Sequence, residues 1–337
     1  MMISSTIGDM AQTFRMRLQT NDLKQRMDQL TLDLTQGVSI QQAKTIPGGL
    51  SRLGDLEHDL IILDRRKHAA IEAQFTTNVM QTALERVQSV TNDLAATAVL
   101  ASPETGPAYL SSTAGQARAA LDATVAALNT TAAGRAIFAG ADVAGPALVS
   151  AQDIMTAART AVAGAASADD ILIALSAMFD PTGGPYDTAL YQGGSTSLSP
   201  FQLGAGESVA LDLRADDPAL RHTIKHMVAA ALVDDPAAPL SVAERGDLAR
   251  MAGQGLYGAE QGLVTIRANL GHAESRIEAA TSRLSAELNL LQRARNDLIA
   301  VDPFEAASEL DAVQTQLETL YAITARSSRL SLVAFLR

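Results

Sequence analysis

The stretch TIRANLGHAESRIEAATSRLSAELNLLQRARNDLIAV, residues 265–301, decides how this chain folds. An apolar residue recurs there at every seventh position: Leu270, Ile277, Leu284, Leu291 and Leu298. The positions between are filled by Ala273, Ala280, Ala294 and Val301, and Leu288 stands beside the one exception, Glu287. A heptad pattern places a narrow apolar stripe along a long helix, which another helix has to cover. A helix from Thr265 to Val301 would be roughly 55 Å long.

Two further apolar stripes lie at the chain ends, and each lacks an obvious partner. The amino-terminal stripe consists of Ile3, Ile7, Met10, Phe14, Leu23, Met27, Leu30 and Leu34. The carboxy-terminal stripe follows a break at Asp302-Pro303 and consists of Leu310, Val313, Leu317, Leu320, Leu330, Leu332 and Phe335. If the chain folds out and back, these two helices run antiparallel. Because the stripes reach almost to the chain ends, where most proteins fray, we expect them to pack between subunits as well.

The regions between these helices contain shorter predicted elements. Pro47 and the Gly48-Gly49 pair favour a loop over residues 38–50. Predicted helices cover 51–94, 108–137, 150–164, 168–179, 218–233 and 242–251, and predicted strands lie at 208–214 and near Tyr191. The predicted fold is therefore mainly α, with long antiparallel terminal helices forming a coiled-coil rod and a smaller α+β outer domain inserted in the middle.

This pattern predicts three regions. Residues 1–37 and 302–337 would form a terminal coiled coil, and residues 38–140 and 241–301 a helical rod domain. Residues 141–240 would form an acidic outer domain, because residues 141–220 alone carry ten Asp or Glu and two Arg. For the helices between residues 51 and 137 we favour ordinary packing within one chain, without an assembly role.

Composition limits the possible functions. The 337 residues include no Cys and no Trp, and 4% are aromatic, whereas enzyme pockets are usually rich in aromatic side chains. The net charge of −11 argues against nucleic acid and anionic membranes as partners, since both bind basic surfaces. No cleaved signal peptide and no apolar stretch of about 20 residues is visible. We therefore expect no membrane insertion, and either a cytoplasmic location or export without a cleaved signal.

Two motifs that suggest ligands are better explained structurally. Residues 253–258 (GQGLYG) match G-x-G-x-x-G, but a helical pattern precedes them where a dinucleotide site needs a strand, so we expect a flexible entry to the long helix. His222 and His226 are four residues apart and could share a metal. They have no intervening Glu and no obvious third ligand, so we interpret them as surface histidines of a helix.

Two acidic pairs likewise fit a structural role. Asp169-Asp170 and Asp216-Asp217 lack the spacing of a calcium loop, and both pairs fit helix starts. No activated nucleophile is visible. We therefore expect no catalytic, cofactor-binding or metal-binding residues, no cofactor and no enzymatic activity.

Several short motifs resemble one protein family. RANLG at residues 267–271 opens the heptad helix, EAASEL at 305–310 follows the break, and QTQLETLY lies at 314–321. TQG at 35–37, PGGL at 47–50 and GRAIFAG at 134–140 add to the pattern. Together these motifs resemble bacterial flagellins and flagellar hook-associated proteins over about residues 1–140 and 250–337. The final residues are most similar to the hook–filament junction type, because residues 325–329 (ARSSR) lack the Asn-Gln-x-Pro usual in flagellins.

The resemblance implies a structural axial protein of the bacterial flagellum that joins hook to filament. It implies export by the flagellar type III apparatus without a cleaved signal, hence a secreted, extracellular location. The implied partners are copies of the chain, hook-side and filament-side axial proteins (including flagellin) and an export chaperone. The implied assembly interface is the set of fifteen apolar residues in the two terminal stripes.

Two alternatives remain at this stage. One is a flagellin, that is, a filament subunit, which the final residues argue against. The other is a cytoplasmic signalling coiled coil, which is disfavoured by the compact region inserted between paired ends.

Overall fold

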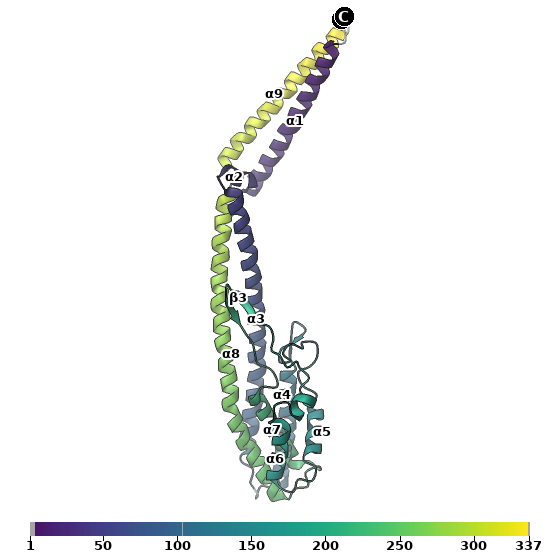
Figure 1. The fold of residues 1–337 in the computed structure, drawn as a ribbon, viewed down its shortest axis with the longest axis vertical. Helices are drawn as coiled ribbons and strands as arrows, with labels where there is room; N and C mark the ends of the chain where they lie inside the picture. Colours follow the sequence, from purple (N-terminus) through teal and green to yellow (C-terminus); the bar gives the residue numbers. More distant parts are fainter. Residues whose placement is uncertain (1–3, 103, 336–337) are drawn as a thin grey trace. The chain divides into compact units, whose positions relative to one another are not determined.

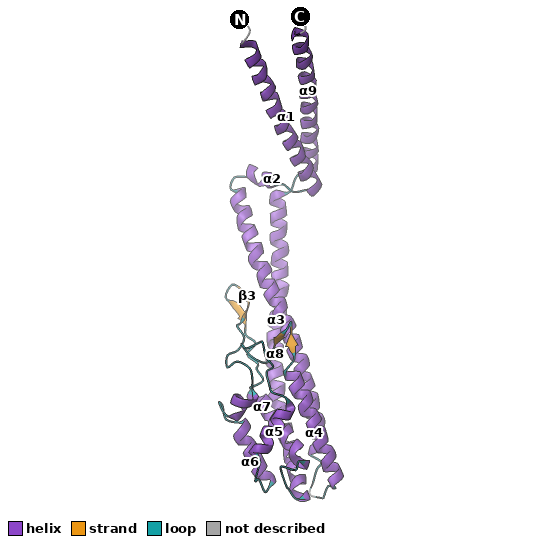
Figure 2. Ribbon diagram, turned by 90° about the vertical axis from the view of Figure 1, so that its right-hand side faces the viewer, coloured by secondary structure: helices purple, strands orange, loops and turns teal. Residues whose placement is uncertain are grey.

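A computed structural model describes residues 4–102 and 104–335, with the side chains of residues 11, 14–102 and 104–326. The helices are α1 (Ser4–Gln36), α2 (Ile40–Thr45), α3 (Gly49–Ala98), α4 (Pro107–Leu128), α5 (Ala151–Ala161), α6 (Ala168–Phe179), α7 (Pro218–Ala231), α8 (Val242–Ile299) and α9 (Pro303–Phe335) (Figure 1). A π-helical turn spans Tyr186–Leu190 and a 3₁₀ turn spans Leu232–Asp234. The strands form two antiparallel hairpins: β1 (Thr131–Ala132) with β2 (Arg135–Ala136), and β3 (Phe201–Gly204) with β4 (Glu207–Val209). The predicted mainly α class, with a smaller α+β part, is confirmed (Figure 2).

The chain divides into two compact units. The terminal unit contains Met1–Asp64 and Ala286–Arg337, and the central unit contains Arg65–Ser285. The three-region division expected from the sequence is not tested by this result and stays a prediction.

In the central unit, helices from distant parts of the sequence enclose one apolar core. Helix α7 packs on α4 and α6, and α5 packs on α4 and α6. Every residue from Ile224 to Val233 is buried, so α7 is the central helix of this core. Serine side chains cap the starts of α5 and α6: Ser150 Oγ accepts from Asp153 N–H in α5, and Ser167 Oγ accepts from Asp170 N–H in α6.

The heptad stripe of α8 faces the protein interior as predicted. Leu270, Ile277, Leu284 and Leu298 are buried, and Leu291 is half-buried. Leu288 is buried and takes over at the position where Glu287 interrupts the repeat. The helix is longer than expected, because its 58 residues begin at Val242 and include the segment 242–251 that we had predicted as a separate helix.

In the terminal unit, two backbone hydrogen bonds join the residues that follow α1 to the segment where α8 ends before α9. Ser39 N–H donates to the Ile299 carbonyl at 2.7 Å, and Val301 N–H donates to the Gly37 carbonyl at 3.1 Å. Helix α1 ends at Gly37, whose φ of +70° is the left-handed conformation typical of a helix C-terminus. Asp302 Oδ1 accepts from Phe304 N–H at 2.8 Å and caps α9. The predicted break at Asp302-Pro303 is confirmed.

Three sequence-based boundaries are wrong. Residues 38–50 are not a continuous loop, since Ser39 caps the short helix α2 and Ala43 is buried. The helix predicted to reach Ile137 ends at Leu128, because Asn129 turns away to pair with both backbone polar groups of Leu148. The strand predicted at 208–214 is shorter and belongs to the β3–β4 hairpin, with Gly206 at φ +75° in its turn.

Candidate assembly interface

The first and last helices pack side by side in antiparallel orientation, as the two stripes predict (Figure 1). Arg26 forms an ion pair with Glu309 at 3.6 Å, and Lys24 Nζ lies 5.9 Å from the ring centre of Tyr321. Farther along, the Thr324 hydroxyl lies 3.7 Å from Met16 Sδ. Later residues of α9 thus meet earlier residues of α1. We call α1 and α9 the terminal helix pair.

The terminal helix pair buries only part of its apolar stripes. Val313 and Leu317 are buried. The half-buried members of the predicted interface are Leu23, Met27, Leu30, Leu34, Leu310 and Leu320. Phe14 remains 64% exposed. The other six predicted residues, Ile3, Ile7, Met10, Leu330, Leu332 and Phe335, lie outside the residues whose side chains are described. Contact between the two stripes of one chain is therefore seen, whereas packing between subunits stays a prediction.

Further apolar side chains on the same two helices point to solvent. The large exposed ones are Phe14, Leu18, Leu32, Phe304, Tyr321 and Ile323. Phe304, at the start of α9, is 82% exposed. A two-helix pair can cover one face of each helix and leaves the remaining apolar side chains in water. Such a surface is typical of a protein that associates with other chains.

At the base of the terminal helix pair lies a polar cavity of about 390 Å³. Asp33 of α1 is buried there and accepts a hydrogen bond from Gln29 Nε2 at 2.7 Å. Glu305 and Glu309 of α9 also line this cavity. Beside it lies a small apolar cluster, at the break between α1 and α3 and the end of α8: Ala43, Leu53, Leu298 and Ile299, with Val38 and Leu56 against them.

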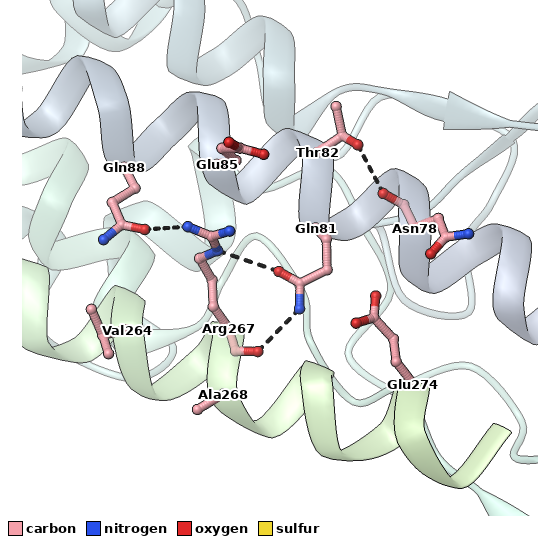
Figure 3. Close-up of a pocket in the computed structure, with 9 residues that line it drawn as sticks. All are labelled: Asn78, Gln81, Thr82, Glu85, Gln88, Val264, Arg267, Ala268 and Glu274. Carbon is pink, nitrogen blue, oxygen red and sulfur yellow. Dashed lines mark hydrogen bonds between the residues drawn. The ribbon is translucent and has the colours of Figure 1, made fainter. Parts of the chain in front are cut away.

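In the central unit, a polar seam joins α3 to α8 (Figure 3). The Arg267 guanidinium donates to Gln81 Oε1 at 3.3 Å through Nε and to Gln88 Oε1 through Nη1. Gln81 Nε2 donates in turn to the Arg267 carbonyl at 3.1 Å. Because both glutamines bind one arginine, sliding α3 along α8 by a turn would leave half-buried polar groups unpaired. The seam therefore fixes the register of the two helices.

This seam gives the RANLG motif a structural role that the sequence did not reveal. Arg267 lies three residues before the buried Leu270, and the heptad pattern alone marks it only as a polar neighbour. Its partners stand 186 and 179 residues earlier in the chain. No local signal could identify them.

The glycine motif at residues 253–258 is part of a helix crossing. All of it lies within α8, so the expected flexible entry to the long helix is wrong. A Cβ on Gly253 would lie 2.5 Å from the backbone nitrogen of Val99, and a Cβ on Gly255 would lie 2.2 Å from the His226 ring. These two glycines let neighbouring segments approach closely, which gives both of them a structural role.

The two histidines are placed differently from expectation. His222 is half-buried, but His226 is only 9% exposed, so the surface interpretation is wrong for His226. Within the described part of the chain, no cluster of three or more His, Cys, Asp or Glu is arranged to hold a metal. The acidic pairs do start helices: Asp169-Asp170 opens α6, and Asp217 caps α7 by accepting from Ala219 N–H at 2.9 Å.

Comparison with known protein families gives a match in the carboxy-terminal helices of the chain. Residues 255–336 match the model of the bacterial flagellin C-terminal helical region. This chain carries a flagellin-type C-terminal region. The match runs through most of α8 and α9, and it confirms the resemblance to flagellins over this part of the chain. No curated protein sequence gives a significant match.

The fold of this chain is also similar to that of a solved structure. A protein of Vibrio parahaemolyticus, provisionally designated a flagellar hook-associated protein, aligns with a TM-score of 0.51 at 10% identity. The alignment covers 75% of this chain and 98% of the other. At that identity the likeness concerns the fold. Among the described residues, none of the helices combines the length and apolarity needed to cross a bilayer.

Proposed function

We propose that this chain is a structural axial protein of the bacterial flagellum that joins the hook to the filament. The observation that carries the proposal is the terminal helix pair: α9 lies within the flagellin-type region, and the pair leaves large apolar side chains in water. The fold shared with a hook-associated protein supports the same role. The role requires no catalytic step.

The apolar residues of the terminal helix pair supply the assembly contacts in this proposal. An isolated two-helix pair exposes Phe14, Phe304 and Ile323, whose burial would stabilise an assembly by about 25 cal/mol for each Å² removed from water. Copies of the chain, hook-side proteins and flagellin are the proposed partners. Before assembly, an export chaperone would cover the same surface.

The junction role is preferred to a filament role because of residues 325–329 (ARSSR), which lack the Asn-Gln-x-Pro usual in flagellins. A deletion strain separates the two roles. For a junction protein, hooks remain, filaments are lost, and flagellin appears in the culture medium. Normal filaments on the deletion strain would refute both roles.

The assembly surface is tested by a matched pair of substitutions on α9. Ile323→Ser removes an exposed apolar side chain, and Thr319→Ser changes an exposed polar position of the same helix. We expect Ile323→Ser to reduce complementation of the deletion strain, with the secreted amount of protein unchanged. Thr319→Ser should complement fully. Equal complementation by both variants would contradict an assembly role for this face.

Export is tested separately. The chain should appear in the medium of a hook-deficient strain and disappear from it when the flagellar type III apparatus is inactivated. Retention inside wild-type cells would exclude the extracellular location.

A further inference from the structure

Charge is unevenly distributed along the terminal helix pair. The tip half, residues 4–20 and 319–335, contains four Arg and one Asp, a formal net charge of +3. The base half, residues 21–36 and 302–318, contains eight Asp or Glu, one Lys and one Arg, a formal net charge of −6. Because the two helices are antiparallel, both contribute to each of these charged ends. One chain therefore presents two surfaces of opposite charge.

Three arginines lie together in the tip half. Arg15 and Arg17 flank Met16 on α1, and Arg326 lies two residues after Thr324 on α9. Because the Thr324 hydroxyl lies 3.7 Å from Met16 Sδ, the three arginines are near the same level of the pair. All three are exposed, and none of them forms an ion pair with a described residue. We call these three arginines the basic tip.

The polar cavity of about 390 Å³ in the base half has the opposite charge. The charged residues that line it are Arg26, Asp33, Asp302, Glu305 and Glu309. Asp33 is only 7% exposed, and its carboxylate accepts a hydrogen bond from the neutral Gln29 side chain at 2.7 Å. No Lys, Arg or His among the described residues pairs with it, since Arg26 pairs with Glu309. Burial of a carboxylate is costly unless a cation pairs with it, so a cation entering this cavity would be stabilised.

The carboxylates of this cavity suit an organic cation better than a metal ion. Over the residues that the structure describes, no three His, Cys, Asp or Glu side chains are grouped to hold a metal. A guanidinium is planar and binds carboxylates through paired hydrogen bonds. Lys44 does not line the cavity. Arg326 of the same chain is roughly 25 Å from Glu309 along the axis of α9, which is farther than a side chain extends. An arginine of the basic tip can therefore reach the cavity only from another chain.

We propose that the base cavity of one chain binds an arginine of the basic tip of a second copy. The proposal rests on the proposed function and names the offset at which copies meet: the tip half of one terminal helix pair lies beside the base half of the next. Apolar burial has no direction, whereas charge complementarity selects a register and disfavours contact between like charges. Packing of copies in register would place tip against tip and base against base.

Exposed apolar side chains accompany the charges at both places. Leu18 and Ile323 lie near the basic tip, and Leu32 and Phe304 lie near the base cavity. The offset arrangement would remove these side chains from water in the same contact that pairs the charges. Apolar contact would then supply the attraction, and the arginine would determine where along the helix pair it forms.

Cysteine crosslinking tests the offset, because the chain has no Cys of its own. Thr45→Cys places a thiol on the cavity wall, and Ala325→Cys places one beside Arg326. A disulfide needs Cα atoms within about 7 Å, whereas Ala325 is roughly 28 Å along α9 from Ala306, which lines the same cavity. The two thiols can therefore form a disulfide only between chains.

The crosslinking is carried out on flagella of the deletion strain complemented with the full-length double variant. Mild oxidation should give disulfide-linked dimers and longer products, whereas each single variant should stay uncrosslinked. Absence of crosslinks in the double variant, or dimers formed by Thr45→Cys alone, would overturn the proposal.

Neutral variants in the double-cysteine background test the charge. Glu305→Gln removes an exposed carboxylate that lines the cavity, and Glu318→Gln removes an exposed carboxylate of the same helix outside it. We expect Glu305→Gln to lower the yield of crosslinked dimer by on the order of 10-fold and Glu318→Gln to leave it unchanged. Equal yields for these two variants would contradict recognition by charge.

Asp33→Asn gives an independent check on the buried carboxylate. Asparagine keeps an oxygen that can accept from Gln29, so the chain should unfold in urea at no lower concentration than the wild type. The crosslinked yield should nevertheless fall as it does for Glu305→Gln. An unchanged yield would show that Asp33 does not bind the incoming arginine.

The two proposals fail in distinguishable ways. Normal filaments on the deletion strain would reject the proposed function and this contact with it. Restoration of filaments by the double-cysteine variant, without crosslinks between tip and base, would reject this contact alone.

Discussion

The terminal helix pair and the core around α7 are built from equally regular helices, yet they differ in how much they bury. Helix α1 has 33 residues, and among its described side chains none of the apolar ones is fully buried. Helix α7 has 14 residues, of which eleven are buried. Helical periodicity alone therefore does not stabilise a helix in water. Most of the stability comes from packing, so within one chain α1 is less stabilised than α7.

The largest expected difference between the two regions comes from removing one phenylalanine ring from each. Phe179 of α6 is fully buried and packs on Tyr186 with ring centres 5.4 Å apart, whereas Phe14 of α1 is mostly exposed. We expect Phe179→Ala to lower the free energy of unfolding by about 3–5 kcal/mol, because it opens a cavity in the core. Phe14→Ala should change it by no more than about 0.5 kcal/mol.

Urea unfolding of the monomer, followed by circular dichroism, measures both values. Similar losses for the two variants would mean that the terminal helix pair is as well packed as the core. Phe14→Ala should nevertheless impair assembly, so this substitution would affect function while leaving the stability of the monomer nearly unchanged.

A smaller effect is expected at the crossing of α8 and α7. Gly255→Ala should destabilise the central unit by about 1–3 kcal/mol, because the new methyl group meets the His226 ring at 2.2 Å. Gly258→Ala is the control: nothing lies within 4 Å of its added Cβ, so alanine should stabilise α8 by about 0.5–1 kcal/mol. Thermal unfolding should therefore shift in opposite directions for the two variants. A shift in the same direction would show that the close crossing is absent.

The smallest effect distinguishes the polar contacts of the two regions. Arg267→Met removes the half-buried seam between α3 and α8 and leaves Gln81 and Gln88 without their donor, which should cost about 1–2 kcal/mol. Arg26→Met breaks the exposed pair with Glu309 in the terminal helix pair and should cost at most about 0.5 kcal/mol. Denaturant titrations of both variants under one buffer compare them directly. A larger loss for Arg26→Met would reverse our ranking of the two regions.

Local sequence signals were reliable where one residue decides the conformation. Asp302-Pro303 separates α8 from α9, and Asp169-Asp170 opens α6. The heptad stripe also faces the interior as predicted, with Leu288 buried beside the exception Glu287. Each of these features depends only on residues within one or two helical turns, so the local sequence is enough to predict it.

The wrong predictions concern features that depend on residues distant in the sequence. Helix α4 stops at Leu128 because Asn129 binds the backbone of Leu148, and an alanine-rich pattern gives no sign of that partner. His226 looked like a surface residue because its cover, Gly255, is 29 positions later and is conspicuous only as part of a nucleotide-like motif. In the candidate interface, the stripes predicted which faces meet, but not that Phe14 and Phe304 would stay uncovered.

The sequence by itself determined the long helices, the heptad stripe and the break at Asp302-Pro303, because periodicity and capping act over a few residues, and its two terminal stripes indicated that α1 pairs with α9. Only the tertiary structure decided the register of α3 against α8, the glycine-mediated crossing of α8 and α7, and the end of α4, where Asn129 binds the backbone of Leu148. Those features require residues that are distant in the sequence to come within a few ångströms of one another. The sequence pattern gives no sign of which distant residues will meet.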